Sequence, residues 1–97
     1  MVIKEWVNIE SNLGRFLGIK KHCNDKITCL KFANYEVWYS YETLIMVIDL
    51  KSNRKMLTEQ HIQSNMTSKH AEYMCGHDRK TRSFLLENET FYLLKMN

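Results

Sequence analysis

The sequence predicts an α+β fold: one antiparallel β-sheet of three to five strands, with two or three short helices packed on one face. Residues 27–59 hold several segments rich in β-branched and aromatic residues, separated by short polar turns. Beyond residue 60, apolar residues recur at helical spacing instead. A chain of 97 residues has room for one hydrophobic core, so we expect residues 1–97 to form a single compact domain.

The N-terminal part is ambiguous between helix and strand. Its apolar residues fall loosely at helical spacing, but Gly14 and Gly18 weaken a continuous helix. We expect a short helix or strand, then a second segment near Arg15–Lys20. The polar stretch 20–25 should form a turn.

The middle of the chain predicts an antiparallel meander. Ile27–Phe32 alternates with the two-residue period of a strand, and residues 33–36 follow as a tight connection. Residues 37–41 form the next strand, and after a turn Leu44–Leu50 has the composition of a buried strand. After a second polar turn, Lys55–Glu59 is predicted as a short edge strand.

A helix is predicted shortly after residue 60. Ser64, Asn65 or Thr67 can cap its N-terminus, and Gly76 suits its C-terminal end. The residues of its buried face stand at positions i, i+4, i+7 and i+8, and they are Met66, His70, Tyr73 and Met74.

The C-terminal part predicts an exposed loop and a last helix. The segment His77–Arg82 is polar and mostly basic, which is typical of a solvated loop. Asn88 can cap a following helix in which Phe91 and Leu94 face the core.

Composition and charge restrict the class of function. The net charge of +3, from 14 basic and 11 acidic residues, permits nucleic-acid binding without implying it, because duplex-DNA binders usually carry a larger basic excess. The longest apolar run, Leu44–Ile48, is far shorter than the roughly 20 residues that cross a bilayer, and the N-terminus lacks a signal-peptide pattern. Three cysteines without a framework spacing fit a reducing compartment. We therefore expect a soluble intracellular protein without membrane contact.

The segment "NMTSKHAEYMCGHD" (65–78) raises the question of a metal site. Zinc takes four Cys, His or carboxylate ligands, usually as two closely spaced pairs. His70, Cys75 and His77 show no such pairing, so we interpret Cys75 as a small buried residue and His77 as a loop residue, and expect no metal. The metal-binding alternative would need further ligands from His22, Cys23, Cys29 or His61.

Nucleophilic catalysis is the second possibility for this segment. Cys75, with His70 or His77 and Asp78, supplies the residue types of a nucleophile, a base and an orienting group. The sequence shows no strained turn, glycine-rich phosphate loop or paired carboxylates to accompany them. We therefore expect a protein that is not an enzyme, with no catalytic residues and no cofactor.

Two interpretations are open for the segment Thr67–His70. In the structural one, the hydroxyl groups cap a helix, and His70 forms a hydrogen bond back to the sheet, with Ser40 or Tyr41. In the other, the helix start binds a phosphate or a nucleic acid through Thr67 and Lys69, with Lys80 nearby. A basic loop containing Arg79, Lys80 and Arg82 extends this alternative to single-stranded nucleic acid.

The density of aromatic residues favours a protein-binding function. Tyr35, Trp38 and Tyr39 alternate across one strand, and a small domain cannot easily bury every ring. Exposed tyrosine, tryptophan and arginine side chains dominate the binding energy of many protein interfaces. We therefore predict a partner-binding surface formed by Tyr35, Trp38, Tyr39, Arg79 and Arg82.

Two stretches resemble a known group of proteins. The segment "VWYSYETLIMVID", followed further along by "TSKH", is similar to a small family of uncharacterised domains encoded by bacteriophages and mobile elements. The resemblance covers residues 27–75. It singles out five positions where the family motif falls, namely Ser40, Thr43, Thr67, Lys69 and His70.

This resemblance implies a phage origin rather than a particular chemistry. By analogy with small phage proteins, it suggests an inhibitor of a host defence complex, of the anti-CRISPR type, that acts stoichiometrically by occlusion in the host cytoplasm. The expected partner is a host protein or ribonucleoprotein complex, and homodimerisation through an edge strand is a variant. A nucleic-acid-binding accessory protein is the alternative.

Overall fold

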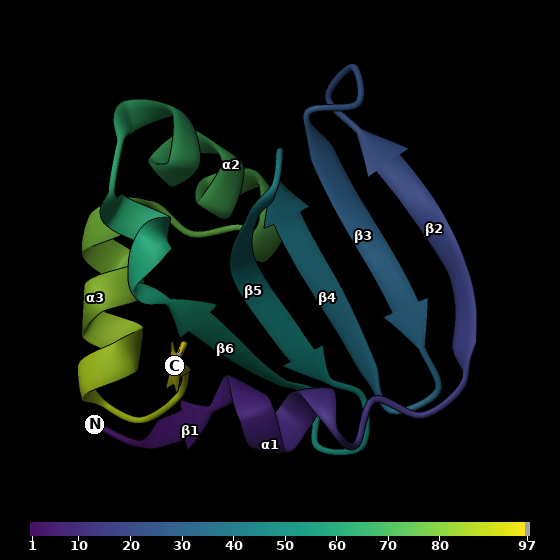
Figure 1. Cartoon of the computed structure of the whole chain (residues 1–97). Helices are drawn as coiled ribbons and strands as arrows, with labels where there is room; N and C mark the ends of the chain where they lie inside the picture. Colours follow the sequence, from purple (N-terminus) through teal and green to yellow (C-terminus); the bar gives the residue numbers. More distant parts are fainter. Residues whose placement is uncertain (97) are drawn as a thin grey trace.

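The computed structural model describes residues 1–96, which form one seven-stranded mixed sheet with helices on both faces (Figure 1). The strand order across the sheet is β1-β7-β6-β5-β4-β3-β2, with antiparallel pairing from β2 to β6 and parallel pairing of β7 with both β6 and β1. The strands are β1 (Ile3–Glu5), β2 (Phe16–His22), β3 (Ile27–Phe32), β4 (Tyr35–Ser40), β5 (Thr43–Asp49), β6 (Arg54–Thr58) and β7 (Tyr92–Lys95). The helices are α1 (Trp6–Glu10), the 3₁₀ helix η1 (Glu59–Ile62), α2 (Asn65–Cys75) and α3 (Arg79–Glu87).

Part of the predicted architecture is wrong. The sheet is larger than the predicted three to five strands and is not wholly antiparallel, and the helices do not all lie on one face. The strands β1 and β7 come from opposite ends of the chain and join the sheet only by pairing with each other and with β6. Such pairing is decided by contacts between distant segments, so local periodicity does not reveal it.

The C-terminal prediction is also wrong. The spacing of Phe91 and Leu94 suits a helix, but this segment is the strand β7, in which only Leu94 of the described strand residues is fully buried. Asn88 follows the helix α3 rather than starting a new one. The segment predicted as a basic loop forms the start of α3, because Asp78 caps the helix by accepting a hydrogen bond from the backbone N–H of Thr81 at 2.8 Å.

The strands β3 and β5 and the two ends of the helix α2 confirm the local predictions. The predicted buried face of α2 is wrong in part, because Met66 and Tyr73 are 51% and 53% exposed, and the buried residues are Ala71, Met74 and Cys75. The helix α2 starts at the N-cap residue Ser64, which exchanges hydrogen bonds with Thr67 in a capping box. It ends at Gly76, whose φ of 80° is the left-handed conformation that glycine adopts without strain. The segment predicted as a short edge strand is β6, which lies inside the sheet between β5 and β7.

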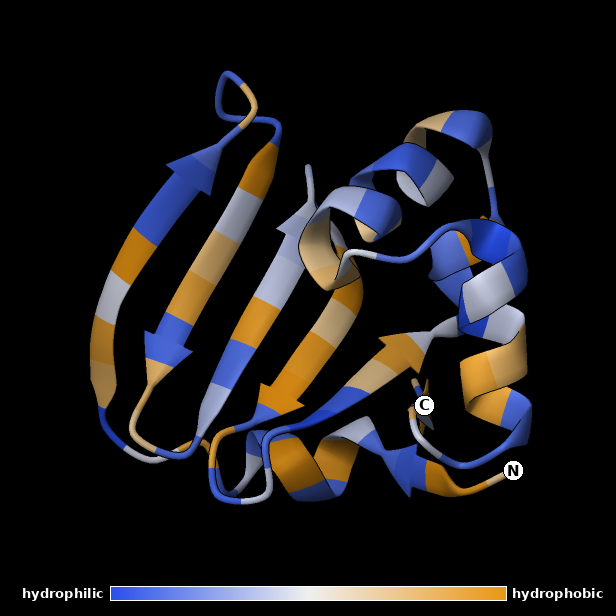
Figure 2. Ribbon diagram, turned by 180° about the vertical axis from the view of Figure 1, so that it is seen from behind, coloured by the Kyte–Doolittle hydropathy of each residue, from blue (hydrophilic) through white to orange (hydrophobic). Residues whose placement is uncertain are grey.

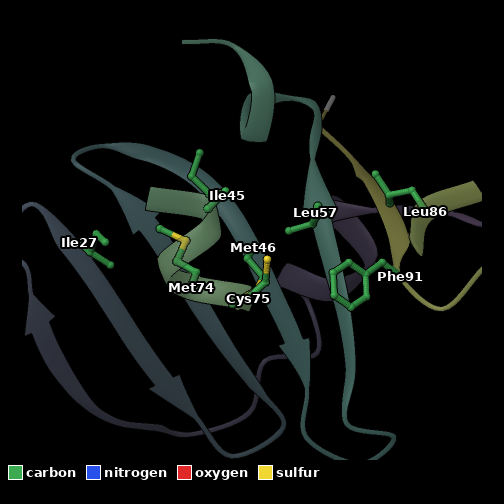
Figure 3. Close-up of a cluster of buried hydrophobic side chains, with 9 residues drawn as sticks. Ile27, Ile45, Met46, Leu57, Met74, Cys75, Leu86 and Phe91 are labelled. Carbon is green, nitrogen blue, oxygen red and sulfur yellow. The ribbon is translucent and has the colours of Figure 1, made fainter. Parts of the chain in front are cut away.

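Two hydrophobic clusters cover opposite faces of the sheet. Successive strand residues point to opposite sides, so Met46 and Val47 of β5 belong to different clusters. Met46 packs with Ala71 and Met74 of α2 on what we call the α2 face, which Figure 3 shows. Val47 packs with Ile9 of α1 on the other side, which we call the α1 face.

The helices cover only part of this sheet. In both views, β2 and β3 extend away from the helices as a hairpin at one side of the molecule (Figures 1 and 2). The tip of this hairpin is tied back to α2, because Nδ1 of His22 lies 2.9 Å from the hydroxyl oxygen of Tyr73. Among residues 1–96, no helix is both long enough and apolar enough to cross a membrane.

Candidate partner-binding surface

The three aromatic residues predicted as a partner-binding strip lie on both faces of β4. Tyr35 and Tyr39 belong to the α1 face, where they pack against the cluster around Val47 and are half-buried. Trp38 lies on the α2 face, where its indole N–H donates to Glu36 at 3.3 Å. The three rings therefore do not form one continuous strip, and each contributes partly to a core.

The uncovered apolar surface lies further out in the sheet, on β3 and β2. Phe16 and Ile19 of β2 are 55% and 57% exposed, although both point to the α1 face. They stand opposite Phe32 and Leu30 of β3, and the rings of Phe16 and Phe32 meet edge to face with centroids 5.5 Å apart. We call these four residues, Phe16, Ile19, Leu30 and Phe32, the open surface.

The sequence did not predict that these four residues form an exposed surface. The segment 16–19 has the composition of a buried strand or helix, and nothing local shows that it lies at the margin of a sheet. The only available signal was the alternation of Leu30 and Phe32 on the strand predicted for residues 27–32. That alternation defines an apolar face but does not say what covers it.

The strand β2 is also a free edge. It pairs with β3 on one side and with no strand of the described chain on the other, so its outer backbone groups are available for pairing. Its pairing with β3 is continuous from Gly18 to His22, after an irregularity between Phe16 and Gly18. A stretch of this length matches a typical β-strand.

The charge along this edge is wholly positive. Arg15, Lys20 and Lys21 occupy or adjoin β2, and no acidic residue occurs between positions 15 and 22. Lys31 of β3 adds an exposed charge opposite Gly18, on the α2 face. The side chain of Lys21 donates to the hydroxyl of Thr28 at 2.9 Å on the α1 face.

Arg82, predicted at the interface, is instead enclosed between α2, η1 and α3 with 0% of its surface exposed. Its Nε donates to Nδ1 of His61 at 2.9 Å, and its two terminal nitrogens donate to the carbonyls of His77 and His61 and to the hydroxyl of Ser68. These acceptors are all neutral. Arg82 therefore holds together three helical segments and is not available to a partner on the surface, whereas Arg79 is exposed on the same helix.

The residues proposed for phosphate binding have other partners or lie apart. The hydroxyl of Thr67 is occupied in the capping box with Ser64, so the first turn of α2 is satisfied by its own side chains. Lys69 and Lys80 are both exposed, on α2 and α3 respectively. Within the described residues, nothing gathers these three side chains into one site.

His70 lies where the structural interpretation placed it. Its Nδ1 and the hydroxyl oxygen of Ser40, at the end of β4, are 2.5 Å apart, which confirms the predicted hydrogen bond from α2 back to the sheet. Burial is the main reason why the pKa of His70 is lowered, with the charge of Lys26 adding to it. Ser40 is itself buried, so this pair joins two elements and does not present a nucleophile to solvent.

The residues of the metal hypothesis do not form a ligand set. Over residues 1–96, no three His, Cys, Asp or Glu side chains are grouped as metal ligands. The thiol of Cys75 is buried and directed to the carbonyl of His77 at 3.6 Å, and burial raises its pKa. The His77 ring packs against Phe91. Burial likewise raises the pKa of Cys29 to about 11, so this thiol is far from reactive.

A groove of about 450 Å³ lies between α1 and the sheet. At one end, Lys4 and Arg54 both lie over the ring of Tyr92, at 5.5 and 4.4 Å from its centre. The lining also includes Glu5 and Asp49, so the cations and carboxylates are balanced and select no class of ligand.

Fold and surface together define an α+β domain with a hydrophobic core on each face of its sheet and, at β2, a basic sheet edge beside an uncovered apolar surface. Comparisons with family models, with curated proteins and with solved structures gave no match.

Proposed function

We propose that this domain is a non-enzymatic protein-binding module, and that the open surface with the edge of β2 forms its binding site. The observation that carries the proposal is the exposure of Phe16 and Ile19, which present apolar side chains to water directly beside an unpaired strand edge. Burial of such a surface by a partner is favourable by about 25 cal/mol for each Å² of apolar area. Half-buried Tyr39 extends the apolar area toward α1.

The chemistry of the interior supports a binding function over catalysis. The most unusual polar residues, Arg82, His61, Ser40 and His70, are hydrogen-bonded to each other or to the backbone across secondary-structure elements. They stabilise the arrangement of the helices on the sheet. The phage origin and the anti-CRISPR type of action stay predictions from the resemblance. If the protein acts by occlusion, the open surface and the edge of β2 are where it would contact the host complex.

The test compares two exposed phenylalanines. Phe16→Ser combined with Ile19→Thr removes the centre of the open surface, whereas Phe84→Ser removes a ring that is 63% exposed on α3, away from β2. Tagged wild-type and variant chains are used to capture partners from cells that produce the protein, and denaturation midpoints establish that all are folded. Affinity of the captured partner is then measured with purified components.

We expect the wild type and Phe84→Ser to retain the same partner. The double variant should lose about 2 kcal/mol of binding free energy or more, which is roughly a thirty-fold loss of affinity. Equal retention by all three chains would place the binding site elsewhere. Capture of nucleic acid that is released at moderate salt would instead favour the nucleic-acid-binding alternative.

A further inference from the structure

The outer edge of β2 presents two chemically different sides to an incoming strand. Phe16 and Ile19 project to the α1 face, where they extend the apolar row of β3. Gly18, Lys20 and His22 stand opposite Lys31, Cys29 and Ile27, and therefore belong to the α2 face. A strand added to this edge would follow the same alternation, with an apolar side and a side that faces lysines.

The charges disfavour pairing between two copies of this chain. In an antiparallel pairing of β2 with itself, centred on Ile19, Lys20 of each copy would stand opposite Gly18 of the other. Both Lys20 side chains would then lie on the α2 face and both Lys21 side chains on the α1 face. Neither strand carries a carboxylate to offset them. Like charges across neighbouring strands are destabilising, and lysine on an edge strand is a common means of preventing such self-pairing.

One carboxylate of the domain, that of Glu36, lies close to this edge on the α2 face. Glu36, the register partner of Lys31, directs its carboxylate to the indole of Trp38. Asp25 lies in the turn after β2, beyond the paired stretch. Lys20 and Lys31 outnumber the single carboxylate of Glu36 and are both exposed, so they can also meet carboxylates from outside.

We propose that β2 accepts an extended, acidic segment of a partner protein as an additional strand, with apolar residues over the open surface and Asp or Glu residues beside Lys20 and Lys31. This inference rests on the proposed binding function and specifies its partner. Main-chain hydrogen bonds to the free edge supply the pairing, and the alternating side chains select the sequence. The stretch Gly18–His22, five residues in continuous register, sets the length of the contact.

The probes are two synthetic nine-residue peptides, blocked at both ends, in which Val alternates with Glu or with Lys. Binding to the full chain is followed by NMR through the amide signals and the hydrogen-exchange rates of residues 18–22. We expect the Glu peptide to shift these signals and slow their exchange, and to bind at least roughly tenfold more tightly than the Lys peptide at low salt. Equal binding of both peptides, or shifts outside β2, would overturn the inference.

Charge reversal makes the test specific. Lys20→Glu combined with Lys31→Glu should invert the preference so that the Lys peptide binds more tightly. The matched control, Lys51→Glu with Lys69→Glu, reverses two exposed lysines elsewhere and should keep the original preference. A reversed variant that still prefers the Glu peptide would contradict the proposed contacts.

Two further measurements distinguish an acidic protein segment from the other molecules that could bind to the edge of β2, namely a second copy of the chain and a nucleic acid. Sedimentation of the wild type should show a monomer at tens of micromolar, and a dimer that Ile19→Lys dissociates would show that the edge binds a second copy. A ten-nucleotide oligothymidylate that shifts β2 more strongly than the Glu peptide would identify the edge as a nucleic-acid site. The Phe16 and Ile19 double variant could lose the cellular partner while the wild type shows no preference between the two peptides. That result would support the proposed protein-binding function and contradict only the pairing of β2 with an acidic strand.

Discussion

Arg82 donates from Nε to Nδ1 of His61 at 2.9 Å, in a position where neither side chain has significant contact with solvent. The same guanidinium binds the carbonyl of His61, so one side chain fixes both the ring and the backbone of η1. A neutral imidazole is required for this contact, because a protonated Nδ1 would be a donor facing a donor. Burial first, and the charges of Arg82 and Arg79 second, lower the pKa of His61 to about 4.

Acidification should therefore destabilise the fold. The pKa of His61 is lower in the folded chain than the ordinary value of 6.5, so between about pH 6.5 and 4 the unfolded chain binds a proton that the folded chain excludes. The stabilisation is complete above pH 6.5 and is lost as the pH falls toward 4, by about 3 kcal/mol in total. Urea denaturation at a series of pH values measures this loss.

His61→Gln is the control for the pH experiment. It removes the titrating group, so the pH dependence between 6.5 and 4 should become clearly shallower, although overall stability falls. His70 has a lowered pKa for the same main reason and contributes a remaining dependence of the same sign. An unchanged slope in His61→Gln would show that His61 is not the group responsible.

Removal of Arg82 should be strongly destabilising. Arg82→Ala leaves two buried and two partly buried acceptors without their donor, at a cost of about 3–5 kcal/mol in the free energy of unfolding. Arg82→Lys should restore only part of this stability, because one ammonium group cannot reproduce the planar fork of the guanidinium. Denaturant titration of the purified variants gives the values.

Arg79→Ala is the matched control on the same helix. Arg79 is exposed, so its removal should change the free energy of unfolding by about 0.5 kcal/mol or less. Similar losses in Arg79→Ala and Arg82→Ala would contradict the buried arrangement.

The contact between Ser40 and His70 should contribute to stability rather than to any reaction. Ser40→Ala removes the partner of Nδ1 at the junction between β4 and α2, which should cost about 1–2 kcal/mol. Ser83→Ala, at an exposed position of α3, should be close to neutral. Both variants should capture the cellular partner as well as the wild type does, because Ser40 lies away from the edge of β2. Loss of capture in a folded Ser40→Ala chain would place the binding site at this pair.

Elements whose signals are local were predictable. Ile27–Phe32 alternates as a strand along its own length, and α2 carries its own start at Ser64 and its own stop at Gly76. The hydrogen bond of His70 to the sheet followed from the position of this histidine on the apolar side of that helix. For the strand and the helix ends, the residues that decide the structure are close together in the chain. The contact of His70 is the exception, because its partner Ser40 lies 30 positions away.

The edge of β2, the parallel strands β1 and β7, and the burial of Arg82 could not be found in this way. Leu93 is a strand residue because it lies between Ile3 and Leu57, which are remote from it in the sequence. Arg82 is enclosed because η1 and the carbonyl of His77 supply acceptors that local propensity does not encode. Local conformational preferences are worth tenths of a kcal/mol per residue. The burial of side chains between paired distant segments contributes several kcal/mol to the free energy of folding. The composition and local patterns of this chain therefore specify its α+β class and several of its elements, and only the packing of distant segments decides which edge and which side chains face a partner.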